Sequence, residues 1–426
     1  MQTKPHPKKA AAALLICFFS IYYLPAAAGR FDVLSAFLKN DALQHAAISI
    51  KAVNVTDGKT IAAFNENTAL TPASNMKIIT TATALIRYGS NHRYRTPLLY
   101  SGTIKDSVLH GNLYIQSSGD PTLGSRYINR SKEHFLHRYL HHIRKAGISS
   151  IEGDIITLDS LFRDEGVSGK WLIEDAGTDY GQGVYSISIF DNIYKTPLPS
   201  DTTSATVIDN PGLYLAQYLK LWLHRHSIPV SGKATTLRTE RQQTHGFNIP
   251  QDLTETGAAY SPPLSEIIRE TNVRSNNHYA EHLYRKLQSD SVNIRLLWQR
   301  HGLDSTALIM YDGSGLSPQN AASASYLTDL LVYMYTHHGK HQGAFYRSLP
   351  LAGKEGTVAT FLKDTPLSGK AHLKSGAISN VQAYSGYIEK ENQYYAFSII
   401  INSFSGKRKD LRKAIERLLT DLFNPE

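Results

Sequence analysis

The chain has 426 residues, of which 42% are hydrophobic and 19% are charged, and its formal net charge is +9. This length suggests roughly two or three domains with packed cores, and the composition excludes collagen-like and disordered classes. The lysines and arginines form no concentrated tract with interleaved aromatic residues, so we expect no nucleic-acid partner.

Residues 1–28 have the pattern of a secretory signal peptide. Three lysines precede the apolar run 10–24, which is shorter than the roughly 20 residues of a membrane span, and residues 26–28 are small. We therefore expect export to the periplasm or beyond, with cleavage near Ala28, which lowers the net charge from +9 to +6. That excess would suit an anionic wall or membrane surface, or simply keep the chain soluble. The only cysteine, Cys17, would be lost, which leaves no disulfide and no thiol nucleophile.

The first part of the mature chain predicts a short helix over 31–38 and then a β-hairpin. Residues 47–55 and 60–64 have the character of strands. The dipeptide Asp57-Gly58 lies between them and is a strong signal for a tight turn.

A second helix begins at Thr71-Pro72, where Thr71 can cap the helix and Pro72 suits its first position, and Gly89 ends it. Ser74 and Lys77 are three residues apart and therefore share one face of this helix. A neutral lysine amine there could take the proton of the serine hydroxyl. Ser-x-x-Lys is common by chance, however, and on its own it more often marks a helix start with a surface lysine.

Between about residue 94 and residue 253 the chain alternates short strands with turns and two longer helices, a texture that indicates an insertion. We place the inserted segment at 96–253 and the catalytic domain at 29–95 and 254–426. The strands are expected at 113–116, 155–158 and 205–208, and the helices at 133–145 and 212–224.

From residue 261 the pattern becomes more regular and predicts three consecutive strands among helices. Helices are expected at 264–288, with one interruption near Ser275, at 324–337 and at 410–423; strands are expected at 372–378, 383–388 and 395–402. Together with the early hairpin, these elements predict an α+β fold in which an antiparallel sheet is covered by helices.

Two further motifs lie in this last region. Ser275 and Asn277 on a tight turn could both point into one cleft, although a polar cap is the more common use of such residues. Lys374 and Ser375 on a predicted strand suit a substrate carboxylate, and Gly376 would let a substrate backbone approach closely. In chain order, the three motifs match the S-x-x-K, S-x-N and K-T-G set of penicillin-recognising serine enzymes, with Ser375 in place of threonine.

The chain resembles the class C low-molecular-mass penicillin-binding proteins, which are D-alanyl-D-alanine carboxypeptidases and endopeptidases. The resemblance implies a β-lactamase/transpeptidase-like domain with a large, mainly β insertion between the first two motifs, which are 201 residues apart here. It rests on the motifs and on matching flanks at 71–74, 80–82, 119–123, 261–264, 312–317, 349–353 and 385–387.

The resemblance also implies roles for the motif residues. Ser74 would attack the carbonyl of the penultimate D-alanine, with Lys77 as the general base. Ser275 would relay a proton to the leaving amine with help from Lys77 and Lys374, and Asn277 would hold the peptide amide. The expected partners are therefore peptidoglycan stem peptides, with β-lactams as covalent inhibitors that acylate Ser74.

Substrate binding involves further residues. The resemblance implies that Ser375, with its neighbouring lysine, holds the terminal carboxylate, and that the N–H of Ala377 contributes to the oxyanion hole with that of the nucleophile. Asp175 and Tyr180 in the insertion match positions that border the substrate side chain, where an acid could pair with a free amine; a structural aspartate and a core tyrosine are the alternative. Two positions depart from some relatives, which carry polar side chains where this chain has Pro318 and Ser379.

No metal or cofactor is expected. His134, His137 and His141 recur at helical spacing, but no carboxylate or cysteine lies close enough in sequence to support a zinc site, so we interpret them as a solvated helix face. Two alternative functions stay open, a β-lactamase on the same fold and a catalytically silent peptidoglycan-binding protein. A β-lactamase would need a deacylating base, for which the sequence provides no matching segment.

Overall fold

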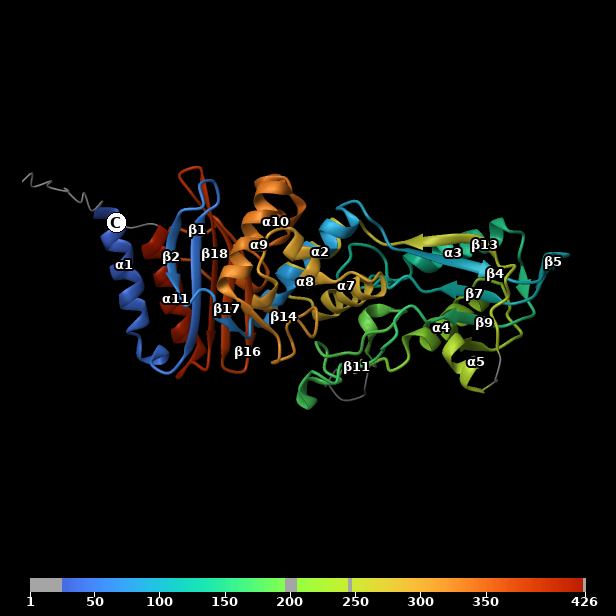
Figure 1. Cartoon of the computed structure of the whole chain (residues 1–426). Coiled ribbons are helices and arrows are strands. Elements are labelled where there is room, and N and C mark those ends of the chain that lie inside the picture. Colours follow the sequence, from blue (N-terminus) through green and yellow to red (C-terminus); the bar gives the residue numbers. More distant parts are fainter. Residues whose placement is uncertain (1–24, 196–204, 244–246, 424–426) are drawn as a thin grey trace, which may run out of the picture.

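The computed structural model describes residues 25–195, 205–243 and 247–423, which form two five-stranded sheets, three smaller sheets and the helices around them (Figure 1). Most of the predicted signal peptide lies outside the described residues. Its predicted cleavage site near Ala28 falls within the first described helix, α1 (Pro25–Leu38), which begins earlier than the helix expected at 31–38. Within the described ranges, we find no helix with the length and apolar character to cross a membrane.

The first large sheet is antiparallel and has the order β16-β17-β18-β1-β2. The predicted hairpin and the three predicted late strands are therefore confirmed and belong to one sheet. Successive side chains point to opposite faces, so Ile399 and Ile401 contact one hydrophobic layer while Ile400 contacts the other. The strands are β1 (Ala47–Asn54), β2 (Thr60–Phe64), β16 (Ala371–Ile378), β17 (Val381–Lys390) and β18 (Gln393–Asn402).

Helices cover both faces of this sheet, as the sequence predicts (Figure 1). The N-terminal helix α1 and the C-terminal helix α11 pack together on one face, so the two ends of the described chain are neighbours. The other face carries a larger group of helices. They are α2 (Met76–Tyr88), α6 (Leu264–Val273), α7 (Asn277–Ser289), α8 (Ile294–Arg300), α9 (Ala324–His337) and α10 (Ala344–Ser348), while α11 spans Arg408–Phe423.

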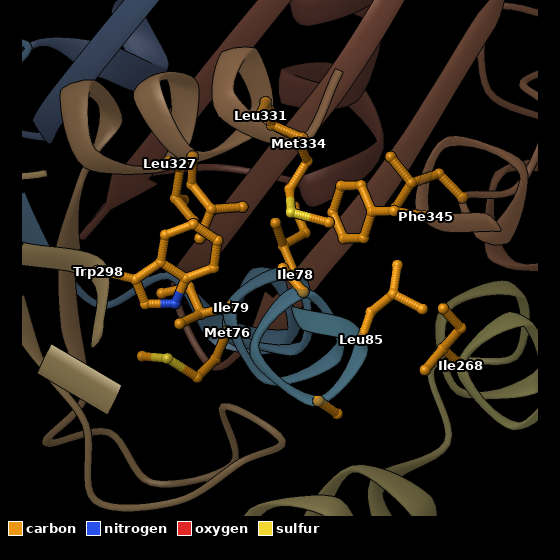
Figure 2. Packing of buried hydrophobic residues seen from close by; sticks show 14 of the residues in the cluster. Met76, Ile78, Ile79, Leu85, Ile268, Trp298, Leu327, Leu331, Met334 and Phe345 are labelled. Carbon is orange, nitrogen blue, oxygen red and sulfur yellow. The ribbon is translucent and has the colours of Figure 1, made fainter. Parts of the chain in front are cut away.

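Helix α2 is surrounded by these other helices and is buried along most of its length. Its predicted end at Gly89 is confirmed, since Gly89 has a φ of 82° and follows the last helical turn. Figure 2 shows side chains from α6, α8, α9 and α10 packed around it. This packing fixes the start of α2, where the first motif lies. The labelled residues are Met76, Ile78, Ile79, Leu85, Ile268, Trp298, Leu327, Leu331, Met334 and Phe345.

Trp298 provides a test of this core. Its side chain is fully buried, and its indole N–H donates to the hydroxyl of Thr83 at 2.8 Å. Replacing Trp298 by alanine should lower the free energy of unfolding by about 3–5 kcal/mol, because it leaves a cavity and removes the hydrogen bond to Thr83. Leu296 on the same helix is 44% exposed, and its replacement by alanine should change the free energy by about 0.5 kcal/mol or less. Urea denaturation followed by circular dichroism measures both values, and equal losses in the two variants would contradict this assignment of the core.

The second large sheet is mixed and has the order β12-β9-β7-β4-β13. The chain enters it through β4 and returns through β13, and these two strands pair side by side. The connection between them therefore begins and ends at one place. The strands are β4 (Arg95–Tyr100), β7 (Leu113–Gln116), β9 (Ile155–Leu158), β12 (Ala234–Thr236) and β13 (Thr254–Tyr260).

Three helices accompany this sheet. The two that the sequence predicts are confirmed, and both pack on the sheet through apolar faces. His134, His137 and His141 lie on the exposed side of the first of them, as expected for a solvated face. The helices are α3 (His134–Lys145), α4 (Pro211–Arg225) and α5 (Leu237–Gln243); the minor strands are β3 (Ala69–Leu70), β5 (Thr103–Lys105), β6 (Val108–His110), β8 (Ser150–Ile151), β10 (Ile193–Lys195), β11 (Ala205–Val207), β14 (Leu308–Ile309) and β15 (Ala321–Ser323).

Candidate active site

All three motifs meet at one cleft. It comprises two cavities of about 660 Å³ and 480 Å³, and both are lined by Ser74, Ser275 and Ala377. These residues come from the start of α2, from the turn between α6 and α7, and from β16. The fold therefore brings together side chains that are up to about 300 residues apart in the chain.

Ser74 lies in a 3₁₀ turn, η2 (Ala73–Asn75), that precedes α2. Ala73 has a φ of 46°, a left-handed conformation that costs a non-glycine residue about 1–2 kcal/mol. The turn is held by neighbours, because the Asn75 amide donates to the Ser385 hydroxyl of the sheet at 2.7 Å. The prediction that Thr71 caps the helix is wrong: its hydroxyl donates to the carbonyl of Pro318 at 3.1 Å. The strained turn takes the place of a capped helix start and presents Ser74 to the cleft.

Lys77 is fully buried, and its amine lies 2.9 Å from the Ser74 hydroxyl. Two other oxygens contact the same nitrogen, Asn277 Oδ1 at 2.6 Å and the carbonyl of Ser314 at 2.7 Å. Burial lowers the pKa of Lys77 to about 7, and the carboxylates of Glu281 and Asp312 act against this shift. A substantial fraction of Lys77 is therefore neutral near pH 7.

The neutral form of Lys77 has two N–H bonds and one lone pair. The carbonyl of Ser314 and the amide oxygen of Asn277 can only accept hydrogen bonds, so they take the two N–H groups. The lone pair is then left for Ser74, whose hydroxyl donates to it across 2.9 Å. The orientation of the Asn277 amide is fixed at its other end, where Nδ2 donates to the carbonyl of Tyr180 at 2.9 Å. The site therefore has the geometry of a serine nucleophile with a general base.

Two buried carboxylates hold the loop that carries the Ser314 carbonyl. Glu281 accepts from the backbone N–H of Ser314 at 2.7 Å, and Asp312 accepts from the N–H of Gly315 at 2.8 Å. Asp312 also accepts from the indole N–H of Trp171 at 3.0 Å. Burial, reinforced by the negative charge of Asp312, raises the pKa of Glu281 to about 7.

The sequence analysis missed Glu281, Asp312 and the Ser314 carbonyl as parts of the site. The segment 312–317 was noted only as a matching flank. An Asp-Gly-Ser-Gly run is a loop signal, but nothing in it indicates that a carbonyl would contact the lysine of the first motif.

Ser275 and Lys374 form the second hydrogen-bonded pair of the cleft. Ser275 lies in the predicted interruption between α6 and α7 and has a φ of 55°. The Lys374 amine donates to the Ser275 hydroxyl at 2.9 Å and to the carbonyl of Ser375 at 2.7 Å. Burial lowers the pKa of Lys374 well below its usual value, and the nearby positive charge of Lys77 adds to this shift.

Gly376 lies where β16 packs against η2. A side chain there would meet the chain itself, since a Cβ would lie 2.6 Å from the carbonyl of Pro72 and 3.1 Å from the Ser74 nitrogen. The contact between β16 and η2 therefore requires a glycine at this position. The neighbouring Ser375 hydroxyl donates to the hydroxyl of Thr357 at 2.8 Å, and Ala377 lines both cavities.

Asp175 and Tyr180 lie on the wall of the larger cavity. Asp175 ends a 3₁₀ turn, η3 (Ile173–Asp175), and its carboxylate accepts from the Tyr180 hydroxyl at 3.1 Å. Tyr180 is 47% exposed, so it is not a core tyrosine. Pro318 and Ser379 line the same cavity. Within the described residues, no group of three or more histidine, cysteine, aspartate or glutamate side chains could hold a metal ion.

Comparison with known families identifies this arrangement. The family model described as D-Ala-D-Ala carboxypeptidase 3 (S13) matches residues 32–203 and 195–422, which together cover most of the chain. The chain belongs to this family. This membership agrees with the resemblance that the motifs and their flanks indicate.

The chain is also similar to individual proteins of known name or structure. It is 24% identical to a D-alanyl-D-alanine carboxypeptidase of Actinomadura sp. (strain R39) over 88% of this chain and 81% of that protein. The crystal structure of penicillin binding protein 4 from Haemophilus influenzae matches 92% of this chain and 98% of that chain, with a TM-score of 0.76 and 20% identity. A structure of the same protein complexed with a β-lactam has a TM-score of 0.69 and 21% identity, covering 92% and 99% of the two chains. The α+β fold predicted from the sequence is therefore confirmed.

Proposed function

We propose that this chain is an exported serine D-Ala-D-Ala carboxypeptidase that acts on peptidoglycan stem peptides through an acyl-enzyme on Ser74. The observation that carries the proposal is the set of contacts around Lys77. Its buried amine lies 2.9 Å from Ser74, while two obligate acceptors take its N–H groups. Membership of the S13 family supplies the reaction class.

In the proposed acylation step, the Ser74 oxygen attacks the carbonyl carbon of the penultimate D-alanine as its proton passes to Lys77. The backbone N–H groups of Ser74 and Ala377 would stabilise the oxyanion. As the C–N bond breaks, the proton taken by Lys77 would reach the leaving amine through Ser275, which gives up its own proton and regains one from Lys77; Ser275 is hydrogen-bonded to Lys374 at 2.9 Å. Water then hydrolyses the ester, which releases the shortened peptide and restores the Ser74 hydroxyl.

Substrate binding follows from the charges in the cleft. Lys374 and Ser375 would hold the terminal carboxylate, and Asn277 would bind the peptide amide once its contact with the Tyr180 carbonyl is exchanged for the substrate. A β-lactam, whose ring amide resembles the scissile bond, would acylate Ser74 in the same way. One solved relative is described as complexed with a β-lactam.

We further propose that residues 1–28 are a signal peptide and that 96–253 form an inserted domain in the catalytic domain of 29–95 and 254–426. The pairing of β4 with β13 supports the insertion, because the chain leaves and returns at one place. Residues 171–180 of the insertion would then contribute one wall of the cleft.

Incubation of the purified chain with an acyl-D-Ala-D-Ala peptide and with labelled penicillin tests the proposed function. We expect one D-alanine released per peptide and one penicillin attached per chain, with the label on the tryptic peptide that contains Ser74. Rapid turnover of a chromogenic cephalosporin would favour a β-lactamase instead. Labelling without D-alanine release would favour a catalytically silent binding protein.

Replacing Asp175 by asparagine tests the proposed recognition of a free amine in the stem peptide. We expect kcat/KM for a peptide with a lysine-type amine at the third residue to fall by about tenfold, because one charge pair worth about 1–1.5 kcal/mol is lost. The N-acetylated peptide should be hydrolysed equally by both proteins. Asp179 is an exposed neighbour outside the cavity lining and provides the control as Asp179→Asn. Loss of activity on both peptides would indicate a structural role for Asp175.

A further inference from the structure

The two cavities of the cleft have opposite charge. The larger cavity is lined by two acidic residues, Glu174 and Asp175, and none of its described lining residues is basic. The smaller cavity is lined by Arg408, Lys409 and Arg412, and none of its described lining residues is acidic. Both cavities reach the nucleophile, so the electrostatic potential changes sign along the cleft across the reacting serine.

The three cations come from the start of α11, next to the turn that joins β16 to β17. The Arg408 guanidinium donates to the carbonyls of Ile378 and Val381 and to the side-chain oxygen of Gln382. All three acceptors are uncharged, and no carboxylate of the described residues pairs with Arg408. Its positive charge therefore stays available to the cavity, while its position is fixed by the hairpin.

The other two cations are closer to solvent. Arg412 donates to the hydroxyl of Thr360 at 2.7 Å and lies 3.4 Å from Glu416, which neutralises part of its charge. Lys409 is exposed, and no ion pair joins it to another described residue. Because its side chain is long and flexible and lies at the cavity wall, Lys409 can change its conformation to contact a charged group in the cavity.

Thr357 and Ser375 also line this smaller cavity. In the proposed reaction, Ser375 and Lys374 hold the carboxylate of the residue that leaves. The cavity beyond them then lies on the leaving-group side of Ser74, and the acidic cavity lies on the acyl side. A single D-alanine has one carboxylate, which the Lys374 and Ser375 pair would already bind, so it leaves the cations of α11 unused.

We infer that the pocket formed by Arg408, Lys409 and Arg412 is a leaving-group subsite that selects residues with a second carboxylate. This inference rests on the proposed function and deepens it. A D-residue with an acidic side chain would place its α-carboxylate at Ser375 and its second carboxylate at α11. The subsite would therefore favour leaving groups that are larger and more acidic than D-alanine.

The test compares two synthetic peptides, acyl-D-Ala-D-Glu and acyl-D-Ala-D-Gln, which have nearly the same size and differ in one charge. We expect kcat/KM to be about 5–10-fold higher for the D-Glu peptide, the range for two partly exposed charge pairs. In the variant with Lys409→Gln and Arg412→Gln, the ratio should fall toward one. The single variant Lys409→Gln, which disturbs no packing, should lose about half of the preference on a logarithmic scale.

Lys413 provides the matched control, since it is an exposed cation of α11 outside the cavity lining. Lys413→Gln should retain both the preference and the release of D-alanine from acyl-D-Ala-D-Ala, within about twofold of the parent chain, as expected for a surface change. Equal rates for the two peptides in the parent chain, or an unchanged ratio in the double variant, would overturn the subsite. A parent chain that releases no D-alanine would contradict the proposed function itself, which separates the two failures.

Discussion

Replacement of Ser74 by alanine is expected to abolish covalent labelling by penicillin and to lower the rate of D-alanine release by about 10⁴-fold or more. The alanine variant has no hydroxyl beside Lys77 that could give its proton to the lysine lone pair and attack the substrate. The only hydroxyl that contacts the Lys77 amine among the described residues is that of Ser74, at 2.9 Å. The alanine variant retains both cavities and both lysines, so it should still bind the substrate without forming a bond. Intact-protein mass spectrometry measures the label, and an amino-acid assay measures D-alanine.

Ser379 offers a matched control for this experiment. It lines the same cavity as Ser74 and sits at the end of the β16–β17 hairpin, where no side-chain hydrogen bond joins it to the described residues. The variant Ser379→Ala should label normally and keep its hydrolysis rate within a few-fold, as expected for a residue outside the proton path. A full-mass penicillin adduct on Ser74→Ala would mean that another residue is the nucleophile.

Sequence periodicity predicted most of the elements because their burial is regular. The late strands alternate between two hydrophobic layers, and α2 is buried on nearly every side by neighbouring helices. The three motifs were found for a different reason. Each motif spans at most four residues, so its members share a turn or strand wherever the chain folds. Their meeting in one cleft depends on the whole fold.

The remaining parts of the site could not be read from the sequence because they depend on contacts between distant segments. Ser314 acts through its carbonyl, an atom that every residue has, so its identity gives no signal. Nothing in the sequence indicates that the missing side chain of Gly376 makes room for the carbonyl of Pro72. Arg412 lies in the amphipathic helix predicted at 410–423 and Arg408 lies just before it. Only the packing of α11 beside the β16–β17 hairpin brings both to the cleft.

The charges around the nucleophile show why Lys77 is suited to act as a base. Complete burial of two lysines is costly. Burial lowers the pKa of Lys77, while the negative charges of Glu281 and Asp312 raise it. The negative charges of Glu281 and Asp312 offset part of that cost. These carboxylates bind the loop that carries Ser314, and it is the carbonyl of Ser314 that contacts the Lys77 amine. The pKa of Lys77 therefore lies near 7. At such a pKa a substantial fraction of the amine is neutral at pH 7, and the neutral amine is still basic enough to take a proton.

Replacement of Lys77 by glutamine should lower the rate of acylation by about 10²–10⁴-fold, the usual contribution of a general base. The proposed base in the parent chain is the neutral form of Lys77, whose pKa is lowered from 10.5 to about 7. Below pH 7 the amine is protonated, so kcat/KM should fall about tenfold for each pH unit, and above pH 7 it should level off. Stopped-flow acylation by a chromogenic β-lactam between pH 5 and pH 9 measures this profile. The control Lys51→Gln removes a lysine paired with Asp329 at 2.7 Å, outside the lining of the cleft, and should keep the parent profile.

Glu281 could produce a similar profile, since its pKa is also raised to about 7. The variant Glu281→Gln distinguishes the two groups. Removing this carboxylate takes away a charge that raises the pKa of Lys77, so the midpoint of the acid limb should move to lower pH. If Glu281 were the titrating group, the acid limb would instead disappear in this variant and persist in the residual activity of Lys77→Gln. A midpoint that moves down in Glu281→Gln, together with a flat profile in Lys77→Gln, is therefore the result that a lysine base requires.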